Sequence, residues 1–569
     1  MRHTRIPFTI FAVALLATAA AAPARAAEPD WQWLWVYCST NLQVNERADG
    51  VLALMERATK ARYNGVLLAD SKFGNLADRP DNYYRNLERV REAADRLGIE
   101  VIPAVIPVGY SGSILQHDPN LAAALPVRDC PMVVRDGVAT VADASNRLPN
   151  GGFEQADGKK IPGWDWMDPC AARDTAVAHS GEASLRMTGF RKKDEHGHGR
   201  VVRKLALAPF RQYRVDCWIR TKDLSGTGKV RIMPLADGQA LNYTEPGVKA
   251  TQEWTRHSIL FNSLRHEEVR LYIGIWGGRD GTLWLDDVSL REVAGVNMLR
   301  REGCPLRVTS DDGRTVYEEG RDFKHWAYPK MGRVPWPGSF EVVHPEPPLV
   351  LTDDSRIAGG ERLRVSFFHT ALIHSGQVAC CLSHPRVFEV LQEQIRLVKK
   401  YLRPKKYMMS HDEIRVAGWC DLCRAAGANA GEVLAKNVRR CTDIIRRTDP
   451  EAEIFVWSDM FDPHHNARAD YYLVASTFEG SWEGLDPSVH VVCWYFGKRA
   501  ESMPFFAGRG HKILMAGYYD QADVKANVLG WREAAGKVSG AARGLMYTTW
   551  RHNYEDLETF ARLATQPRE

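Results

Sequence analysis

Short apolar segments alternate with amphipathic helical segments in two parts of the chain, and this alternation constrains the fold most strongly. Three apolar segments lie near the start, at 33–39, 65–70 and 99–109, and five follow at 406–413, 453–461, 489–497, 512–520 and 544–550. Strands separated by helices pair in parallel. Eight of them predict an α/β fold with a closed TIM (β/α)8 barrel. A doubly wound sheet is the alternative, but no glycine-rich phosphate loop follows the first strand.

The pattern changes in the middle of the chain. Residues 147–293 contain short strands between Gly, Asn and Asp turns, which predicts an inserted β-sandwich of the jelly-roll type. Residues 294–360 are rich in proline and are expected to form an irregular linker or accessory β region. The predicted barrel is therefore split into residues 27–146 and 361–569, with 362–370 as an extension or extra strand.

The first 26 residues are typical of a secretory signal peptide. Arg2 and Arg5 precede an apolar stretch, and Ala24-Arg25-Ala26 fits the small-x-small cleavage rule. The stretch is short for a membrane span, so we expect an exported protein, periplasmic or extracellular, with no membrane span. Removal of the signal takes the formal charge from +5 to +2 because three arginines are lost. This low charge argues against nucleic acid as a partner.

Eleven cysteines are present, and Cys420-x-x-Cys423 is the only pair with the spacing of a metal site. A zinc knuckle requires a second such pair, and Cys380-Cys381 lacks the spacing. The sequence therefore favours one local disulfide or partly buried thiols.

Carboxylates and aromatic residues mark the ends of the predicted strands, where the active site of a barrel lies. These residues are Tyr37, Asp70, His411, Asp412, Glu413, Trp457, Asp459, Trp494, Tyr495, Tyr518, Tyr519, Asp520 and Trp550. Asp70 and Asp459 are also typical helix caps. The adjacent pair Asp412-Glu413 is harder to explain structurally. An acid, a second charged group and aromatic platforms suit glycoside hydrolysis, whereas the absence of a strand-end lysine disfavours a Schiff base.

The Asp412-Glu413 pair at the end of the fourth strand resembles that of the family 20 glycoside hydrolases, the β-N-acetylhexosaminidases. The resemblance implies that Glu413 is the acid/base and that Asp412 orients the substrate's 2-acetamido group, which acts as nucleophile. Tyr518-Tyr519-Asp520 resembles the family's Tyr-x-Asp, so Tyr518 would contact the acetamido oxygen and Asp520 a sugar hydroxyl. Trp457, Trp494 and Trp550 would wall the pocket, and His411, Asp459 and Tyr495 complete the expected substrate-binding set. The chain departs from the family in lacking the Gly-Gly before Asp412, the Arg of the first strand and the Glu after the last Trp.

The predicted insert resembles carbohydrate-binding modules of families 4, 9 and 22. "NGGFE" (150–154) is similar to their opening and "WLDDVSL" (284–290) to their closing strand. A structural calcium often joins these ends in such modules, which makes Glu154 and Asp287 candidate ligands, although a surface Glu and a turn Asp are equally compatible with the sequence. Trp164, Trp166, Trp218 and Trp276 are candidates for a sugar platform or for the core.

The sequence thus predicts an exported glycoside hydrolase that acts on an oligo- or polysaccharide without a catalytic cofactor. One alternative pairs Glu413 as acid with Asp520 or Asp459, at a separation of about 5 Å for retention or about 6.5–9.5 Å for inversion. A second is a non-catalytic polysaccharide-binding protein. A third is a metal-dependent hydrolase that uses His411, Asp412 and His464.

Overall fold

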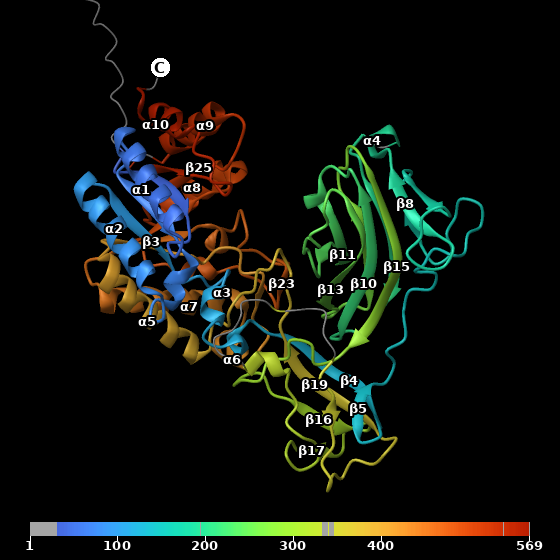
Figure 1. Ribbon diagram of the computed structural model, residues 1–569. Coiled ribbons are helices and arrows are strands. Elements are labelled where there is room, and N and C mark those ends of the chain that lie inside the picture. The colour runs from blue at the N-terminus through green and yellow to red at the C-terminus, as the bar shows by residue number, and fades with distance from the viewer. Residues whose placement is uncertain (1–30, 194, 333–339, 341–345, 539, 568–569) are drawn as a thin grey trace, which may run out of the picture.

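The computed structural model describes residues 31–193, 195–332, 340, 346–538 and 540–567. The predicted signal peptide at 1–26 lies outside these residues. Figure 1 shows a helix-covered barrel on one side, a β-sandwich on the other, and a smaller sheet below them. Within the described part of the chain, no helix has the length and apolar character needed to cross a bilayer.

Eight parallel strands form the closed barrel in the order β1-β2-β3-β20-β22-β24-β25-β26. Their bounds are Trp33–Ser39, Gly65–Ala69, Glu100–Val105, Lys406–Met409, Glu453–Trp457, Val489–Cys493, Ile513–Tyr518 and Ala542–Thr548. Every segment predicted as a barrel strand supplies one of them. The pairing of β3 with β20, Met408 opposite Ala104, joins the two parts of the barrel across the inserted residues.

Helices separate most of the barrel strands and lie outside them (Figure 1). The longer helices are α1 (Asn45–Lys60), α2 (Asp81–Leu97), α5 (Pro385–Leu402), α7 (Ala430–Thr448), α8 (Arg499–Gly508), α9 (Val524–Gly536) and α10 (Leu557–Thr565), and the shorter ones are α3 (Gly112–Leu115) and α6 (Asp421–Ala426). The short helix α4 (Phe190–Lys193) lies instead at the end of the sandwich (Figure 1). α2 ends at Gly98, whose φ of 65° is left-handed. Glycine adopts this conformation at helix ends without steric cost.

The barrel interior is a compact aromatic and aliphatic cluster. Along β1, Trp33, Trp35 and Tyr37 belong to this inner cluster, whereas Leu34 and Val36 belong to the large core that includes the helix layer. This alternation follows from the two-residue period of a strand. Val492, Leu514 and Met546 fill the interior from the last strands.

The middle of the chain forms two five-stranded antiparallel sheets that pack as a sandwich (Figure 1). One sheet has the order β13-β10-β15-β8-β7, with bounds Gln252–Asn262, Gln212–Lys222, Thr282–Val293, Ser184–Thr188 and Ala171–Asp174. The other has the order β12-β11-β14-β9-β6, with bounds Gln239–Ala240, Val230–Ala236, Glu268–Ile275, Gly199–Ala206 and Trp166–Met167.

A six-stranded sheet joins residues from both sides of the sandwich, in the order β17-β16-β19-β4-β5-β18. Its strands are Val316–Tyr317, Arg307–Ser310, Arg362–His369, Leu125–Arg135, Val138–Val141 and Leu349–Val350. β4 and β5 fall in the range expected for the first part of the barrel, and β19 in that expected for the second. The structure instead pairs β4 with β19, because each supplies the hydrogen bonds and apolar face that the other needs. Two short strands, β21 (Val416–Ala417) and β23 (Leu473–Val474), form a separate parallel pair, and β21 lies shortly after β20 in the chain.

Candidate active site

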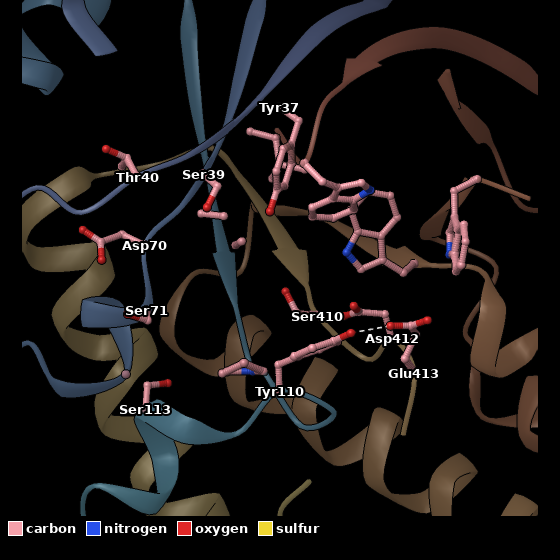
Figure 2. Close-up of a pocket in the computed structure, with 18 of the residues that line it drawn as sticks. Tyr37, Ser39, Thr40, Asp70, Ser71, Tyr110, Ser113, Ser410, Asp412 and Glu413 are labelled. Atoms are coloured by element: carbon pink, nitrogen blue, oxygen red, sulfur yellow. Dashed lines mark hydrogen bonds between the residues drawn. The ribbon is translucent and has the colours of Figure 1, made fainter. Parts of the chain in front are cut away.

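A cavity of about 670 Å³ opens at the carboxyl ends of the barrel strands. Figure 2 shows Asp412 and Glu413 on one side, with Tyr37 directed into the space from the opposite wall. A second part of the lining is small and polar and includes Ser39, Thr40 and Asp70. Asp70 itself is a cap, as its position suggested, because its carboxylate accepts from the Lys72 and Leu42 backbone amides at 2.9 Å.

Asp412 and Glu413 both line the cavity although they are adjacent in sequence. Alternation along an extended strand would send one of them outward. Glu413 has a φ of 50°, in the left-handed region, and this turn brings its side chain back to the cavity. A non-glycine residue in this conformation costs about 1–2 kcal/mol. Asp459 offsets the cost by accepting a hydrogen bond from the Glu413 backbone amide at 2.8 Å.

The carboxylate of Glu413 is held by two donors. Arg415 Nη2 lies 2.8 Å from Glu413 Oε1, and the Tyr110 hydroxyl donates to Glu413 Oε2, as Figure 2 shows. Arg415 is buried and also donates to Gln377 Oε1. Gln377 in turn donates to the Glu413 carbonyl at 2.7 Å. This network fixes the orientation of a side chain that remains 27% exposed to the cavity.

Asp412 lies deeper than Glu413 and has a different environment. It faces the cavity, but protein surrounds it, and burial raises its pKa to about 8, with further contributions from Asp459 and Glu413. Burial also raises the pKa of Asp459 to about 7. Asp459 is fully buried, and its oxygens accept from Asn466 Nδ2 at 3.0 Å and Trp494 Nε1 at 3.2 Å. The site thus holds carboxyl groups whose environments differ sharply, a pattern common to acid–base catalysis.

Aromatic rings cover the remaining wall. Trp494 stacks on Tyr519 with ring centres 5.8 Å apart, and Trp550 meets Tyr37 edge-on at 4.8 Å. Trp550 is 48% exposed at the rim, whereas Trp457 is buried at the cavity wall. Flat apolar faces beside carboxylates match a sugar ring, whose C–H groups pack on aromatic planes and whose hydroxyls need polar partners.

Gly109 positions the loop after β3 beneath the carboxylate pair. A Cβ at Gly109 would lie 1.9 Å from the Asp412 carbonyl oxygen, well inside van der Waals contact. Only glycine allows the two backbones to approach this closely.

The structure brings eight of the predicted strand-end residues to the cavity lining: Tyr37, Asp70, Asp412, Glu413, Trp457, Trp494, Tyr519 and Trp550. Asp459 lies directly behind them. His411 lies elsewhere: it is fully buried, its Nε2 is 3.1 Å from Asn437 Oδ1, and burial lowers its pKa to about 4. The strand alternation that points Ser410 and Asp412 inward points His411 toward α7. We therefore assign His411 to packing rather than to substrate binding.

Tyr518 also lies outside the cavity, where it stacks on Tyr547 at 4.3 Å. Tyr519 lines the cavity in its place. Regular alternation along β25 would direct the Tyr518 side chain into the barrel. The backbone is left-handed at Tyr518, with a φ of 72°, so the inward position passes to Tyr519. Tyr495 is 43% exposed and packs on His465 outside the cavity lining.

Asp520 accepts from the Thr549 hydroxyl at 2.6 Å and from the Trp550 backbone amide at 2.8 Å. It therefore holds the loop that carries the rim tryptophan. The expected metal set of His411, Asp412 and His464 is not assembled: within the described residues, the only group of metal-ligating side chains close enough to share an ion is Cys381, Cys420 and Cys423.

Sequence reasoning missed Arg415, Tyr110 and Gln377. It named Tyr519 as a strand-end aromatic residue, but the family resemblance assigned the acetamido contact to its neighbour Tyr518. Arg415 lies two residues beyond Glu413, and this spacing does not predict a contact between them unless the left-handed turn at Glu413 is known. Tyr110 and Gln377 come from loops, and the sequence does not indicate which loop faces the site.

In the sandwich, the structure places the predicted calcium ligands Glu154 and Asp287 near each other. The position that a Cβ on Gly152 would occupy lies 3.6 Å from Glu154 Oε1, 3.6 Å from Asp287 Oδ1 and 3.7 Å from Asp286 Oδ1. Burial raises the pKa of Asp286 to about 6. Carboxylates are oxygen donors of the kind that calcium prefers, but among the described residues these three are not close enough to share an ion. Asp287 already accepts from the Ser180 hydroxyl at 2.8 Å and lies 2.6 Å from His179 Nδ1.

Comparison with known proteins gives remote likenesses only. No family model matches the chain, and no curated protein matches it. Solved structures similar to it include "Family 16 Carbohydrate Binding Module-2" (16% identity, 26% of this chain, 99% of that chain, TM-score 0.19). Another is the CBM22-1 xylan-binding domain from Paenibacillus barcinonensis Xyn10C (15%, 27% and 97%, TM-score 0.19).

A rhamnosidase from Novosphingobium sp. PP1Y is similar over a longer stretch, at 12% identity and a TM-score of 0.33. The alignment covers 92% of this chain and 55% of the rhamnosidase. At these TM-scores the likenesses leave the activity to be inferred from the site itself.

Proposed function

We propose that this protein is an exported glycoside hydrolase, with a TIM (β/α)8 catalytic barrel and an inserted jelly-roll module. The observation that carries the proposal is the pairing of two unlike carboxyl groups in one aromatic-walled cavity. Glu413 is held by Arg415 and Tyr110, whereas burial raises the pKa of Asp412 to about 8. Glycoside hydrolysis needs two groups of this kind beside the glycosidic bond.

In this proposal Glu413 is the general acid and later the base. Its side chain reaches the cavity, and its orientation is set by Arg415 and Tyr110 before substrate binds. It donates a proton to the departing oxygen and then takes one from the attacking water. Asp412 lies beside it and stabilises the positive charge that develops on the sugar. A nearby positive charge favours the ionised form of Asp412. The proton that Asp412 then releases passes to the Glu413 carboxylate, which delivers it to the departing oxygen.

Asp412 is the best partner for Glu413 among the three acids considered. Asp459 is fully buried, and its oxygens accept from Glu413 N, Asn466 and Trp494. Asp520 accepts from Thr549 and the Trp550 amide. Neither has the open position in the cavity lining that Asp412 has.

We further propose that the substrate carries a 2-acetamido group that acts as the nucleophile. The adjacent Asp412 and Glu413 support this mechanism, since an intramolecular nucleophile removes the need for a third carboxylate. Tyr519, rather than Tyr518, is then the tyrosine placed to contact the acetamido group, because it lines the cavity next to Trp494.

The insert is proposed to bind glycan. Trp166 is 46% exposed on β6, and the Arg200 guanidinium lies 5.4 Å from its ring centre and 5.5 Å from that of Trp276. An exposed indole and a half-buried one, with a guanidinium between them, form a platform of the kind on which a sugar ring stacks. Trp164, by contrast, is buried and belongs to the core of the sandwich.

The first experiment tests Glu413→Gln on aryl glycosides whose leaving groups differ in acidity. The variant should fold normally and lose about 10²–10⁴-fold in rate on poor leaving groups, with a smaller loss on good ones. Glu389→Gln, at an exposed position on α5, is the matched control. Near wild-type rates in a folded Glu413→Gln protein would remove Glu413 from the mechanism.

The second experiment compares matched substrates with a 2-acetamido or a 2-hydroxyl group, and measures inhibition by a thiazoline. The thiazoline resembles the ring formed by acetamido attack, so it should bind far more tightly than the parent sugar. Comparable rates on both substrates with no inhibition would exclude acetamido participation and leave Asp412 as an enzyme nucleophile.

A further inference from the structure

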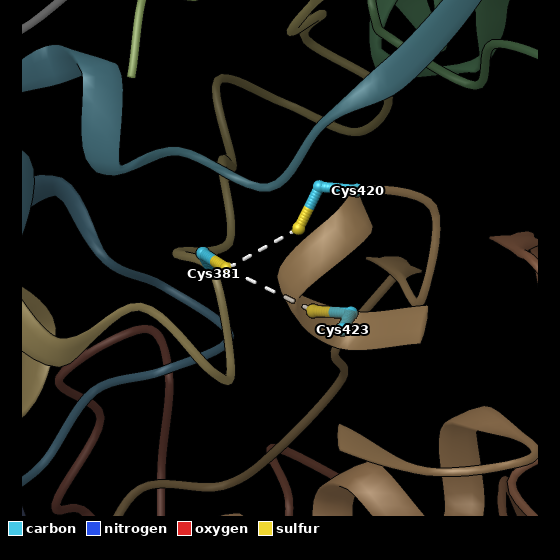
Figure 3. Close-up of side chains that lie close together, drawn as sticks. All are labelled: Cys381, Cys420 and Cys423. Carbon is cyan, nitrogen blue, oxygen red and sulfur yellow. Dashed lines mark hydrogen bonds between the residues drawn. The ribbon is translucent and has the colours of Figure 1, made fainter. Parts of the chain in front are cut away.

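Three cysteines from two distant segments meet in the interior beside the barrel. Figure 3 shows Cys381, from the chain between β19 and α5, facing Cys420 and Cys423 at the start of α6. Cys381 Sγ lies 3.6 Å from Cys420 Sγ and 3.7 Å from Cys423 Sγ. All three are buried and none is in a disulfide.

These sulfur separations match a tetrahedral metal site. With a zinc–sulfur bond of about 2.3 Å, tetrahedral geometry places two sulfurs about 3.8 Å apart. A disulfide would need about 2.05 Å. A small void of about 10 Å³ lies at the same place, lined by Cys381, Cys420 and Cys423 together with Trp419 and Leu382. That volume is about one water-sized sphere, enough for a single ion.

Cys304 is the candidate for a fourth ligand, from a third segment, the chain between the sandwich and β16. It is buried. Its sulfur lies outside the group of three whose ligand atoms are all within 4.8 Å of one another, so a movement of its side chain would complete the site. The Asp421 amide donates to the Gly303 carbonyl at 2.9 Å, which joins the backbones beside Cys304 and Cys420.

A half-buried cation, Arg301, lies next to this cluster. Arg301 Nε donates to the Asn120 carbonyl at 2.7 Å, and Arg301 Nη2 donates to the Ala122 carbonyl at 3.1 Å. Four thiolates around a divalent ion carry a net charge of about −2, and a fixed guanidinium would offset part of it.

We propose that Cys304, Cys381, Cys420 and Cys423 bind one structural zinc ion. No second Cys-x-x-Cys pair marks the site along the chain, because two of the four ligands come from segments that only the fold brings together. The ion ties the chain leaving the sandwich to the chain re-entering the barrel, and both to α6, which follows the Asp412-Glu413 loop. Four cysteine ligands leave no open position for substrate, so the site is structural.

The experiment uses the full-length protein purified without chelator. Zinc content is measured by mass spectrometry, and X-ray absorption at the zinc edge reports the ligands. We expect about one zinc per chain, bound by four sulfurs at about 2.3 Å. Cobalt substituted for zinc should give the thiolate charge-transfer bands and visible bands of a tetrahedral site. Neither readout depends on enzymatic activity.

Variants identify the ligands. Cys381→Ser and Cys423→Ser should lose the stoichiometric zinc and lower the Tm, because bound metal contributes directly to stability. Cys380→Ala is the matched control: Cys380 is the adjacent buried cysteine, but its thiol points to the Val108 carbonyl at 3.9 Å. It should retain the zinc.

Two results would overturn the proposal. One is a wild-type protein that contains no metal and takes up no cobalt. Thiol titration after denaturation would then show whether all eleven cysteines are free or two of them form a disulfide, and either state would count against the zinc site. The other is zinc retained by Cys381→Ser and Cys423→Ser. If the variants do not fold, the absorption spectrum of the wild-type protein still decides between sulfur ligation and none.

Discussion

Asp412→Asn should stabilise the folded protein at high pH while it impairs catalysis. In the folded state, burial, Asp459 and Glu413 raise the pKa of Asp412 from 3.8 to about 8. Below about pH 3 the side chain is protonated in both states. As pH rises toward 8, the unfolded chain releases the proton freely but the folded protein does not, so wild-type stability falls across this window. Asparagine has the same shape and no proton to lose.

The size of the effect follows from the pKa difference. At about 1.4 kcal/mol per pH unit, the change from 3.8 to about 8 sets an upper limit on the order of 6 kcal/mol. Asp412 and Asp459 titrate as a pair and the cavity admits water, so we take about half, roughly 2–3 kcal/mol above pH 8. For a barrel of roughly 300 residues that corresponds to a Tm increase of about 3–5 °C.

Calorimetric scans of the wild type and Asp412→Asn at pH 5, 7 and 9 test the prediction. The advantage of the variant should be small at pH 5 and largest at pH 9. Asp95→Asn, at an exposed position on α2, is the control and should show no such trend. A variant whose Tm runs parallel to the wild type at all three pH values would refute the reasoning, because Asp412 would then not be held neutral by the fold.

Three further outcomes are expected. Trp550→Ala removes the rim ring that contacts Tyr37 and should raise KM about tenfold with little change in kcat. The reason is that stacking on this ring is made equally in the ground state and the transition state. A fall in kcat alone would contradict this role. Gly109→Ala places a methyl group against the Asp412 carbonyl and should lower the free energy of unfolding by about 1–3 kcal/mol and reduce activity. Urea unfolding and steady-state kinetics measure the two effects. A variant that is active and equally stable would show that the loop can move away. Calcium should raise the Tm of the full-length protein, chelator should lower it, and Glu154→Gln should abolish the response; an unchanged response in that variant would place the ion elsewhere.

The local pattern of the sequence predicted the barrel well. Each barrel strand lies in a segment chosen for its apolar run and its flanking helices, because a strand buried on both faces must be apolar within its own few residues. The stop of α2 at Gly98 was predictable for the same reason, since a left-handed helix end favours glycine. The position of Asp412 and Glu413 at a strand end also needed no tertiary information.

Pairing between distant segments could not be deduced in this way. β4 and β19 lie more than two hundred residues apart, yet they form adjacent strands of one sheet. The four cysteines of the proposed zinc site are equally dispersed. Sequence spacing reports only neighbours along the chain, whereas these contacts depend on how the sandwich and barrel meet.

The direction of each strand-end side chain was likewise decided by the tertiary structure. Regular alternation correctly separates Asp412 from His411, but it fails at Glu413 and Tyr518, where the backbone is left-handed. At Glu413, a hydrogen bond to the buried Asp459 holds the residue in a conformation that its own sequence does not favour. The sequence determined which residues reach the end of the barrel, and the surrounding packing decided which of them face the cavity, because only packing can compensate the cost of a strained backbone.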